Sequence, residues 1–344
     1  MTIHTKPSTP PTSADVARLA GVSRATVSFV LNDTPGGRVS EQTRRKVRAA
    51  AEELGYVPHA AARSLRAGRS AIVLLVGHSW PIGPLFSSFY RELQQALQRH
   101  GYTGVLYGRS PGTGGDPARA WAELRPAAVL CIEPVLTPSG VETLHRAGTR
   151  AVVTLGIPPV AGAHTLVLDQ SEVGAAAGAH LVATGRRRIG VVVPTDPGLD
   201  AFSSLRLAGV RAAASGGSDV ADAGGAVHVE PLPLDYTEQA AAELADRCRA
   251  LALDAVFAYN DEYAMLVQRA LQDAGLAVPE QVAVVGADDL MLARLLRPRL
   301  TTVHLTLPDG DELAALVDRL VTEPDQVPTT QNLLGVRMVV RESA

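Results

Sequence analysis

Aromatic residues and cysteines are scarce in this chain. Phe, Trp and Tyr make up 4% of the 344 residues, whereas hydrophobic residues as a whole make up 46%. The cores must therefore be built from Ala, Val and Leu. The two cysteines, Cys131 and Cys248, lie far apart and match no metal-ligand spacing. We interpret them as reduced core residues of a cytoplasmic protein, and we expect no metal site.

The chain also lacks features that would indicate other classes of protein. No apolar run is long enough to span a bilayer, so we expect no membrane partner. Residues 1–11 contain three prolines and no apolar stretch of a signal peptide, and we interpret them as a disordered tail. Because there is no glycine-rich phosphate loop and no Ser/His/Asp or Cys/His grouping, we expect no catalytic residue, no cofactor and no enzymatic activity.

Charge is distributed unevenly along the chain. Residues 1–70 contain 11 Lys and Arg against 5 Asp and Glu, a net charge of +6, whereas the whole chain carries −3. A basic N-terminal segment on an acidic remainder is typical of a phosphate-binding module joined to a module that does not bind DNA. The length leaves room for two or three domains.

Residues 15–31 predict two short helices joined by a tight turn. Gly21 can adopt the left-handed conformation that ends the first helix, and Ser23 is a suitable N-cap for the second. Apolar residues at helical spacing bury the second helix. This pattern indicates a helix-turn-helix, whose second helix enters the DNA major groove. A generic helical hairpin is the alternative, and three polar residues expected on the outer surface argue against it: Arg24, Thr26 and Ser28.

A third helix is predicted over residues 41–54, with Arg44 among the basic residues of its polar face. Pro58 ends this region. Residues 59–69 are strong helix formers, but the segment is too short to be a stable helix alone. Leu65 on this basic segment is a candidate apolar wedge for the minor groove. From spacing alone, an ordinary interdomain linker is an equally good interpretation.

The stretch from about residue 13 to 70 resembles the LacI/GalR (lactose-repressor/galactose-repressor) family of bacterial regulators. The matching pieces are DVARLAGVSRATVS, VLND, VSEQTRRKV, AAEELGYVP and AARSL. The resemblance implies a helix-turn-helix domain over residues 12–58 and a hinge helix over 59–69 that is ordered on operator DNA. It also implies which residues contact DNA: Ser23, Arg24, Ala25, Thr26, Ser28, Phe29, Arg44, Tyr56, His59, Ala62 and Leu65. Phe29 replaces a base-reading arginine of many members, and His59 replaces an asparagine, so the operator sequence is not implied.

From residue 71, short apolar runs alternate with amphipathic helices. Such a pattern specifies parallel sheets that helices cover on both faces. We predict an α/β effector-binding and dimerisation core over residues 70–344, made of two Rossmann-like lobes as in periplasmic binding proteins. One lobe is expected from about 70–163 plus 289–304, and the other from about 164–288 plus 305–344.

Candidate effector-binding residues lie at the predicted strand ends, because ligands of open α/β sheets bind there. Trp80 and Phe86 follow the first strand, and both stacking on a sugar ring and packing at the lobe interface remain open for them. Arg206 offers a guanidinium suited to carboxylates or vicinal hydroxyls. Asn260 and Asp288 directly follow strands, where they also fit as helix N-caps. The resemblance favours effector contact for the last three. No aromatic platform is visible in the second lobe's PLPL run.

These observations predict a DNA-binding transcriptional repressor controlled by a small molecule, with a sugar or sugar derivative as the family's common choice. A homodimer would bind a double-stranded, near-palindromic operator in the cytoplasm. The sequence does not indicate whether the effector is an inducer or a corepressor. The alternative is a two-lobed solute-binding protein, which would need an export signal and no DNA-binding head.

Overall fold

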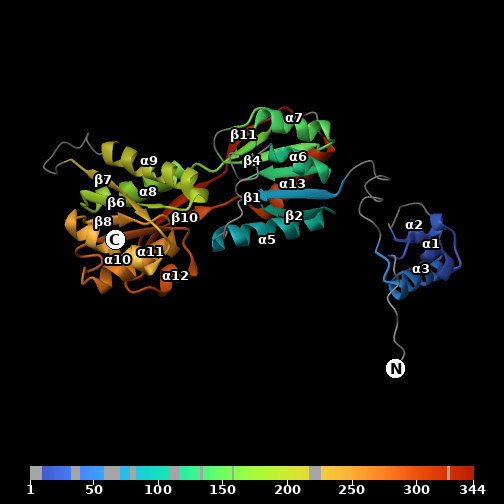
Figure 1. Ribbon diagram of the computed structural model, residues 1–344, viewed down its shortest axis with the longest axis horizontal. Helices are drawn as coiled ribbons and strands as arrows, with labels where there is room; N and C mark the ends of the chain where they lie inside the picture. The colour runs from blue at the N-terminus through green and yellow to red at the C-terminus, as the bar shows by residue number, and fades with distance from the viewer. Residues whose placement is uncertain are drawn as a thin grey trace, which may run out of the picture. The chain divides into compact units, whose positions relative to one another are not determined.

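The computed structural model describes residues 10–31, 39–57, 70–77, 83–108, 116–131, 135–156, 159–216, 226–323 and 326–344. It consists of two compact units, residues 1–71 and residues 72–344 (Figure 1). No helix in the described part of the chain is long and apolar enough to cross a membrane. Both cysteines are free and buried, as predicted.

In the first unit, the described residues form three helices that pack together. Its helices are α1 (Ser13–Ala20), α2 (Arg24–Leu31) and α3 (Glu41–Leu54). Thr12 and Asp15 form a capping box at the start of α1, and Gly21 ends it at φ +66°. The Ser23 hydroxyl accepts the Thr26 N–H at 3.1 Å, so the predicted N-cap of α2 is confirmed. The helices share a core around Val16, Val27, Val30 and Val47.

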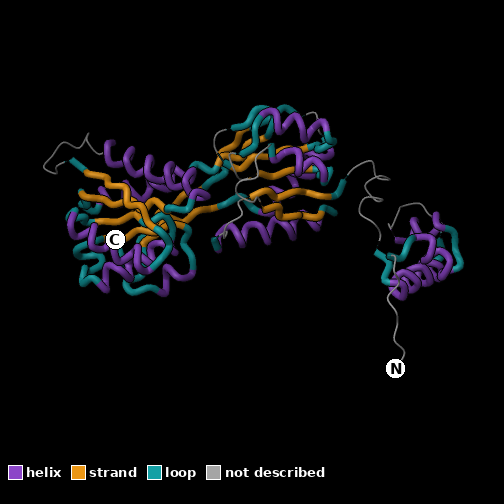
Figure 2. The backbone as a smooth tube through the Cα atoms, in the orientation of Figure 1, coloured by secondary structure: helices purple, strands orange, loops and turns teal. Residues whose placement is uncertain are grey.

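The second unit contains two lobes, each built on a six-stranded sheet (Figure 2). In the first lobe all strands are parallel, in the order β11-β5-β4-β3-β1-β2. Its strands are β1 (Ile72–Gly77), β2 (Thr103–Gly108), β3 (Ala128–Cys131), β4 (Ala151–Leu155), β5 (His164–Val167) and β11 (Thr330–Asn332). Helices α5 (Pro84–Arg99) and α13 (Gly310–Thr322) cover one face, and α6 (Pro117–Glu123) and α7 (Pro138–Arg146) cover the other.

The second lobe has the strand order β12-β10-β9-β8-β6-β7, in which only β12 is antiparallel. Its strands are β6 (Arg188–Pro194), β7 (His228–Leu234), β8 (Ala255–Phe257), β9 (Ala283–Ala287), β10 (Thr301–Thr306) and β12 (Gly335–Val339). Helices α8 (Gln170–Ala183) and α9 (Asp200–Gly216) pack on one face, with α10 (Glu238–Ala250), α11 (Asp261–Asp273) and α12 (Met291–Leu295) on the other. The short 3₁₀ turn η1 spans Pro197–Leu199. The predicted fold class is thereby confirmed.

The division between the lobes differs from the one expected. The segment 289–304 contributes β10 to the second sheet, and the residues after it contribute α13 and β11 to the first. Strand β5 also belongs to the first lobe, because it pairs with β4. The reason is that β10 extends the sheet that already contains β9, and the chain crosses to the first lobe only after Thr306. It returns between β11 and β12, so the lobes are joined by three crossings.

Candidate functional site

The outer face of α2 carries the residues predicted to contact DNA. Arg24, Ala25 and Phe29 are exposed, whereas Val27 and Val30 on the opposite face are buried in the core of the first unit. Thr26 and Ser28 are partly exposed. This arrangement agrees with the prediction that α2 is the DNA-reading helix, since such helices present side chains to base edges.

The remaining predicted DNA contacts are placed only in part. Ser23 is exposed, and Arg44 on α3 and Tyr56 after it are half-buried. Tyr56 also packs against the core of the three helices. Three predicted contacts lie outside the described residues: His59, Ala62 and Leu65. Their proposed roles therefore depend on the sequence alone.

In the second unit, Arg206 is the centre of the candidate effector site. It lies on α9 and is 4% exposed. Its Nε and Nη2 atoms donate to Gln170 Oε1 at 2.9 and 2.8 Å, and Nη1 donates to the carbonyl oxygen of Tyr259. The guanidinium carbon lies 4.5 Å from the centroid of the Tyr259 ring. A buried cation thus has acceptors on two other elements and an aromatic face beneath it.

Two glycines bring Arg206 to this place by letting α8 and α9 approach closely. A Cβ atom on Gly174 of α8 would lie 1.8 Å from the Arg206 carbonyl oxygen. A Cβ atom on Gly209 of α9 would lie 2.0 Å from the carbonyl oxygen of Ser171. Only glycine fits at either position. The contact sets the distance between Arg206 and Gln170, which begins α8.

Asp288 is the acidic partner of Arg206. Its Oδ1 atom lies 3.9 Å from Arg206 Nη2, and its side chain is 12% exposed. Burial raises the pKa of Asp288, although the Arg206 charge lowers it. Asp288 and Asp289 adopt φ values of +99° and +52° just after β9. Such a conformation is costly for non-glycine residues and is found more often at functional sites.

Neighbouring segments hold this strained turn in place. The Asp288 N–H donates to the Val303 carbonyl at 2.8 Å. Arg341, near the C-terminus, donates to Asp289 Oδ1 at 2.5 Å, and His304 Nδ1 lies 3.4 Å from Asp289 Oδ2. The Asp289 carboxylate therefore ties the turn to strand β10 and to the segment that follows β12.

Asn260 and Asp261 connect the same turn to α11. Asn260 is the N-cap of this helix, and its Oδ1 atom accepts the Tyr263 N–H at 3.0 Å. Asp261 accepts the Thr302 hydroxyl at 2.5 Å and the Leu290 N–H at 2.6 Å. Burial raises the pKa of Asp261 to about 7. Asn260 thus has the N-cap role considered from the sequence, and effector contact remains a prediction for it.

Three tyrosines form a row at the same edge of the second sheet. The Tyr259 and Tyr263 rings meet edge to face at 5.8 Å, and the Tyr263 and Tyr236 rings lie 5.0 Å apart. Tyr236 follows the end of β7 and is 50% exposed. We predicted no aromatic platform in this lobe, because the sequence of β7 contains no Phe, Trp or Tyr. The signal available was an aromatic residue directly beyond a strand end.

The two lobes meet beside this platform. Phe86 of α5 and Phe202 of α9 stack with ring centroids 6.5 Å apart. The Glu262 carboxylate of the second lobe is 3.5 Å from where a Cβ atom of Gly83 in the first lobe would lie. Trp80, the other first-lobe candidate, lies outside the described residues. Phe86 thus belongs to a lobe contact and lies next to the candidate site.

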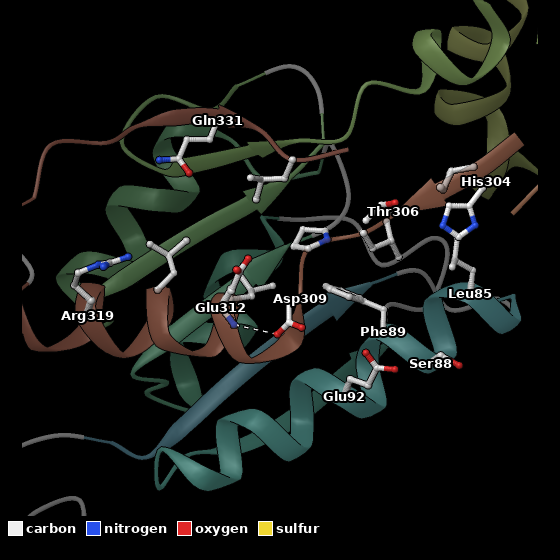
Figure 3. A pocket seen from close by; sticks show the side chains of 16 residues that line it. Leu85, Ser88, Phe89, Glu92, His304, Thr306, Asp309, Glu312, Arg319 and Gln331 are labelled. Atoms are coloured by element: carbon white, nitrogen blue, oxygen red, sulfur yellow. Dashed lines mark hydrogen bonds between the residues drawn. The ribbon is translucent and has the colours of Figure 1, made fainter. Parts of the chain in front are cut away.

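A separate cavity of about 730 Å³ lies along α5 and α13 (Figure 3). Its lining mixes leucines with charged side chains such as Glu92, Glu312 and Arg319. Of the residues predicted to bind effector, those that the structure describes do not line it. His304 lines one end and also faces Asp289, so this cavity adjoins the strained turn. No group of three or more His, Cys, Asp or Glu side chains among the described residues could hold a metal ion.

Comparisons with known proteins identify the family. The model for bacterial regulatory proteins of the lacI family matches residues 12–59, and that for a periplasmic binding protein-like domain matches residues 179–344. The ribose operon repressor of Escherichia coli K12 is 34% identical over 342 residues, which cover 96% of this chain and 98% of the relative. A solute-binding protein alone would not account for the match to residues 12–59.

Two solved structures support the same conclusion. The transcriptional regulator CelR–cellobiose complex is 30% identical, with a TM-score of 0.63 over 97% of this chain and 100% of that one. The lac repressor dimer bound to operator and the anti-inducer ONPF has a TM-score of 0.76 over 97% and 99% of the two chains, and at 22% identity it shows the fold. The chain therefore belongs to the LacI family and is a DNA-binding transcriptional regulator, not an enzyme.

Proposed function

We propose that this regulator is a repressor whose affinity for operator DNA is controlled by a sugar or sugar derivative. The observation that carries the proposal is the buried Arg206–Asp288 pair, which lies at the carboxyl edge of the second sheet beside the tyrosine row. Open α/β sheets bind ligands at this edge. The relatives with sugars in their names or titles, the ribose operon repressor and CelR with cellobiose, support this ligand class.

The side chains at the carboxyl edge of the second sheet suit a neutral compound with several hydroxyl groups. Three of the five guanidinium N–H donors of Arg206 have protein acceptors, and the Asp288 carboxylate 3.9 Å away balances its charge, so the site disfavours a second anion and leaves two N–H donors for ligand hydroxyls. Carboxylate and amide oxygens accept hydroxyl protons. The exposed Tyr236 ring offers an apolar face to the C–H side of a sugar ring. We propose Asp288, Asn260, Arg206 and Tyr236 as second-lobe residues of the site, with Phe86 and Trp80 from the first lobe.

On the DNA side, we propose a homodimer that places two copies of α2 in a near-palindromic operator. The lac repressor dimer bound to operator supports this arrangement. Residues 59–69 are proposed to form a hinge helix on DNA, with Leu65 as the minor-groove wedge. Changing Leu65 to alanine should weaken operator binding and leave effector affinity nearly unchanged; an equal loss of both would contradict the wedge.

The test of effector control begins with a screen. Full-length protein is titrated into a fluorescent operator duplex, in the presence of mono- and disaccharides, phosphorylated sugars and nucleobases. A neutral sugar should change operator affinity. The Arg206→Lys variant should bind the operator normally and lose this response, because lysine cannot reproduce the forked contacts with Gln170.

The matched control is Arg269→Lys on the exposed face of α11, where the arginine pairs with Asp273 in solvent. This variant should respond like the parent protein. If Arg206→Lys keeps the response, the proposed site is wrong. If only nucleobases act, the ligand class is wrong although the site can stand; if only phosphorylated sugars act, the sugar class stands and the expected neutral charge is wrong.

A further inference from the structure

One residue on the DNA-reading helix has a chemistry unlike its neighbours. Phe29 is 43% exposed, and it is absent from the apolar cluster that holds the three helices together. It lies on the face of α2 opposite to Val27 and Val30, which are 1% exposed. Ala25, also exposed, precedes it by one helical turn and shares that face. The outward face of α2 thus carries an apolar strip.

Single exposed apolar residues are common and need no explanation by themselves. Here the position matters, because the outward face of this helix is the surface that meets base edges. A phenyl ring neither donates nor accepts a hydrogen bond, so it cannot read the acceptors of guanine or the donor of cytosine. The only apolar group on a major-groove edge is the C5 methyl of thymine.

We propose that Phe29, together with Ala25, determines operator specificity by contacting the C5 methyl group of a thymine in each half-site. This inference rests on the proposed entry of α2 into the major groove. Contact with the methyl buries apolar surface on both sides, and it favours thymine over cytosine at that position.

The experiment uses the full-length protein and a duplex selected from a random pool by that protein. Each thymine of the selected duplex is then replaced by deoxyuridine, which removes only the methyl group. One thymine per half-site should be sensitive, with affinity about fourfold weaker for each lost methyl. Other thymines should change affinity less than twofold. This part of the experiment uses only the parent protein, so its result does not depend on whether a variant folds.

Two variants test whether Phe29 is the residue that contacts the thymine methyl group. Phe29→Ala should weaken binding to the thymine duplex and lose the sensitivity to deoxyuridine. The control is Leu19→Ala, which removes a residue that is 46% exposed on α1, and it should keep the sensitivity. At the sensitive position, cytosine should bind weakly and 5-methylcytosine should recover part of the affinity.

The outcomes separate this inference from the proposed function. If the protein prefers no duplex over random DNA, the proposed DNA recognition fails. If it prefers one duplex but tolerates deoxyuridine at every thymine, recognition stands and the methyl contact is wrong. If Phe29→Ala retains full sensitivity to deoxyuridine, the methyl is read by another residue and the assignment to Phe29 is overturned.

Discussion

Asp261 shows how a single buried carboxylate can make the stability of this protein depend on pH. Its pKa is raised by burial to about 7, against hydrogen bonds from Thr302 and Leu290 that lower it. In the unfolded chain an aspartate releases its proton near pH 4 (about 3.9). The folded state therefore retains this proton between about pH 4 and 7. The contribution of the Asp261 proton to the free energy of unfolding is complete below about pH 4 and is lost as the pH rises to about 7.

Replacing Asp261 with asparagine should remove this dependence. The free energy of unfolding of the parent protein should fall between pH 5 and pH 8 by on the order of 2 kcal/mol more than that of Asp261→Asn. Urea denaturation at the two pH values measures the difference. Asp273→Asn, at an exposed carboxylate at the end of the same helix, serves as control and should keep the parent slope. Equal slopes for the parent and Asp261→Asn would contradict the assignment.

At this same scale, the sequence predicted some site residues and missed others for a physical reason. Asp288 and Asn260 could be found because they directly follow strands, and the strand pattern is local. Gln170 could not, because it reaches Arg206 only through the packing of α8 against α9. Tyr236 was missed because its role depends on Tyr263, which comes from another helix.

At the level of elements, the α8–α9 contact is the feature on which the site depends. Gly174→Ala would place a methyl group within 1.8 Å of a carbonyl oxygen, and the helices would have to separate. We expect a loss of about 2–3 kcal/mol in the free energy of unfolding, as for other overpacked sites. Sugar response should be lost together with it, because Arg206 moves.

Gly216→Ala at the end of α9 is the matched control. Outside its own helix, no atom of the described residues lies within 4 Å of the Cβ that it would add. Alanine in a helix should stabilise the protein slightly, by about 0.5–1 kcal/mol, or leave it unchanged. Denaturation in urea measures both variants. A similar stability for Gly174→Ala and Gly216→Ala would show that the helix contact is looser than described.

Some strands could be predicted from the sequence pattern, and one could not. The buried strands β1, β3, β4, β8 and β9 were predicted because continuous apolar runs between helices are distinctive. Strand β11 has the sequence TQN and all three residues are exposed, so it has no apolar signal. Its pairing with β5 depends on the path of the chain after α13. Missing this strand contributed to the incorrect division between the lobes, together with the assignment of β10 to the first lobe and of β5 to the second.

For the whole molecule, the uneven charge predicts that salt changes the affinity for operator DNA and the affinity for a sugar to different extents. The N-terminal 70 residues carry a net charge of +6 within a chain of net −3. Operator affinity should fall steeply with salt, by about 0.9 logarithmic units per tenfold change in salt for each phosphate neutralised. Affinity for a neutral sugar should change little. Titrations of both ligands between about 50 and 200 mM salt measure this, and a flat response of operator binding would contradict it.

Reciprocal coupling supplies a second whole-molecule prediction. If saturating both sugar sites of the proposed homodimer changes operator affinity by a given factor, saturating operator must change the product of the two sugar-binding constants by the same factor. Paired titrations of the full-length protein test this equality. An inequality beyond error would contradict two coupled sugar sites per operator-bound dimer.

Because of where the three crossings between the lobes lie, the first lobe can rotate about them as a rigid body. They all lie at the carboxyl ends of its strands, whereas the DNA-binding unit is attached through residue 71 at the amino end of β1. Six residues of β1 span about 20 Å. A rocking motion of about 10° about the crossings would displace that attachment point by about 3 Å. The proposed binding of a sugar beside these crossings would therefore change the position of the attachment point without any rearrangement inside either sheet.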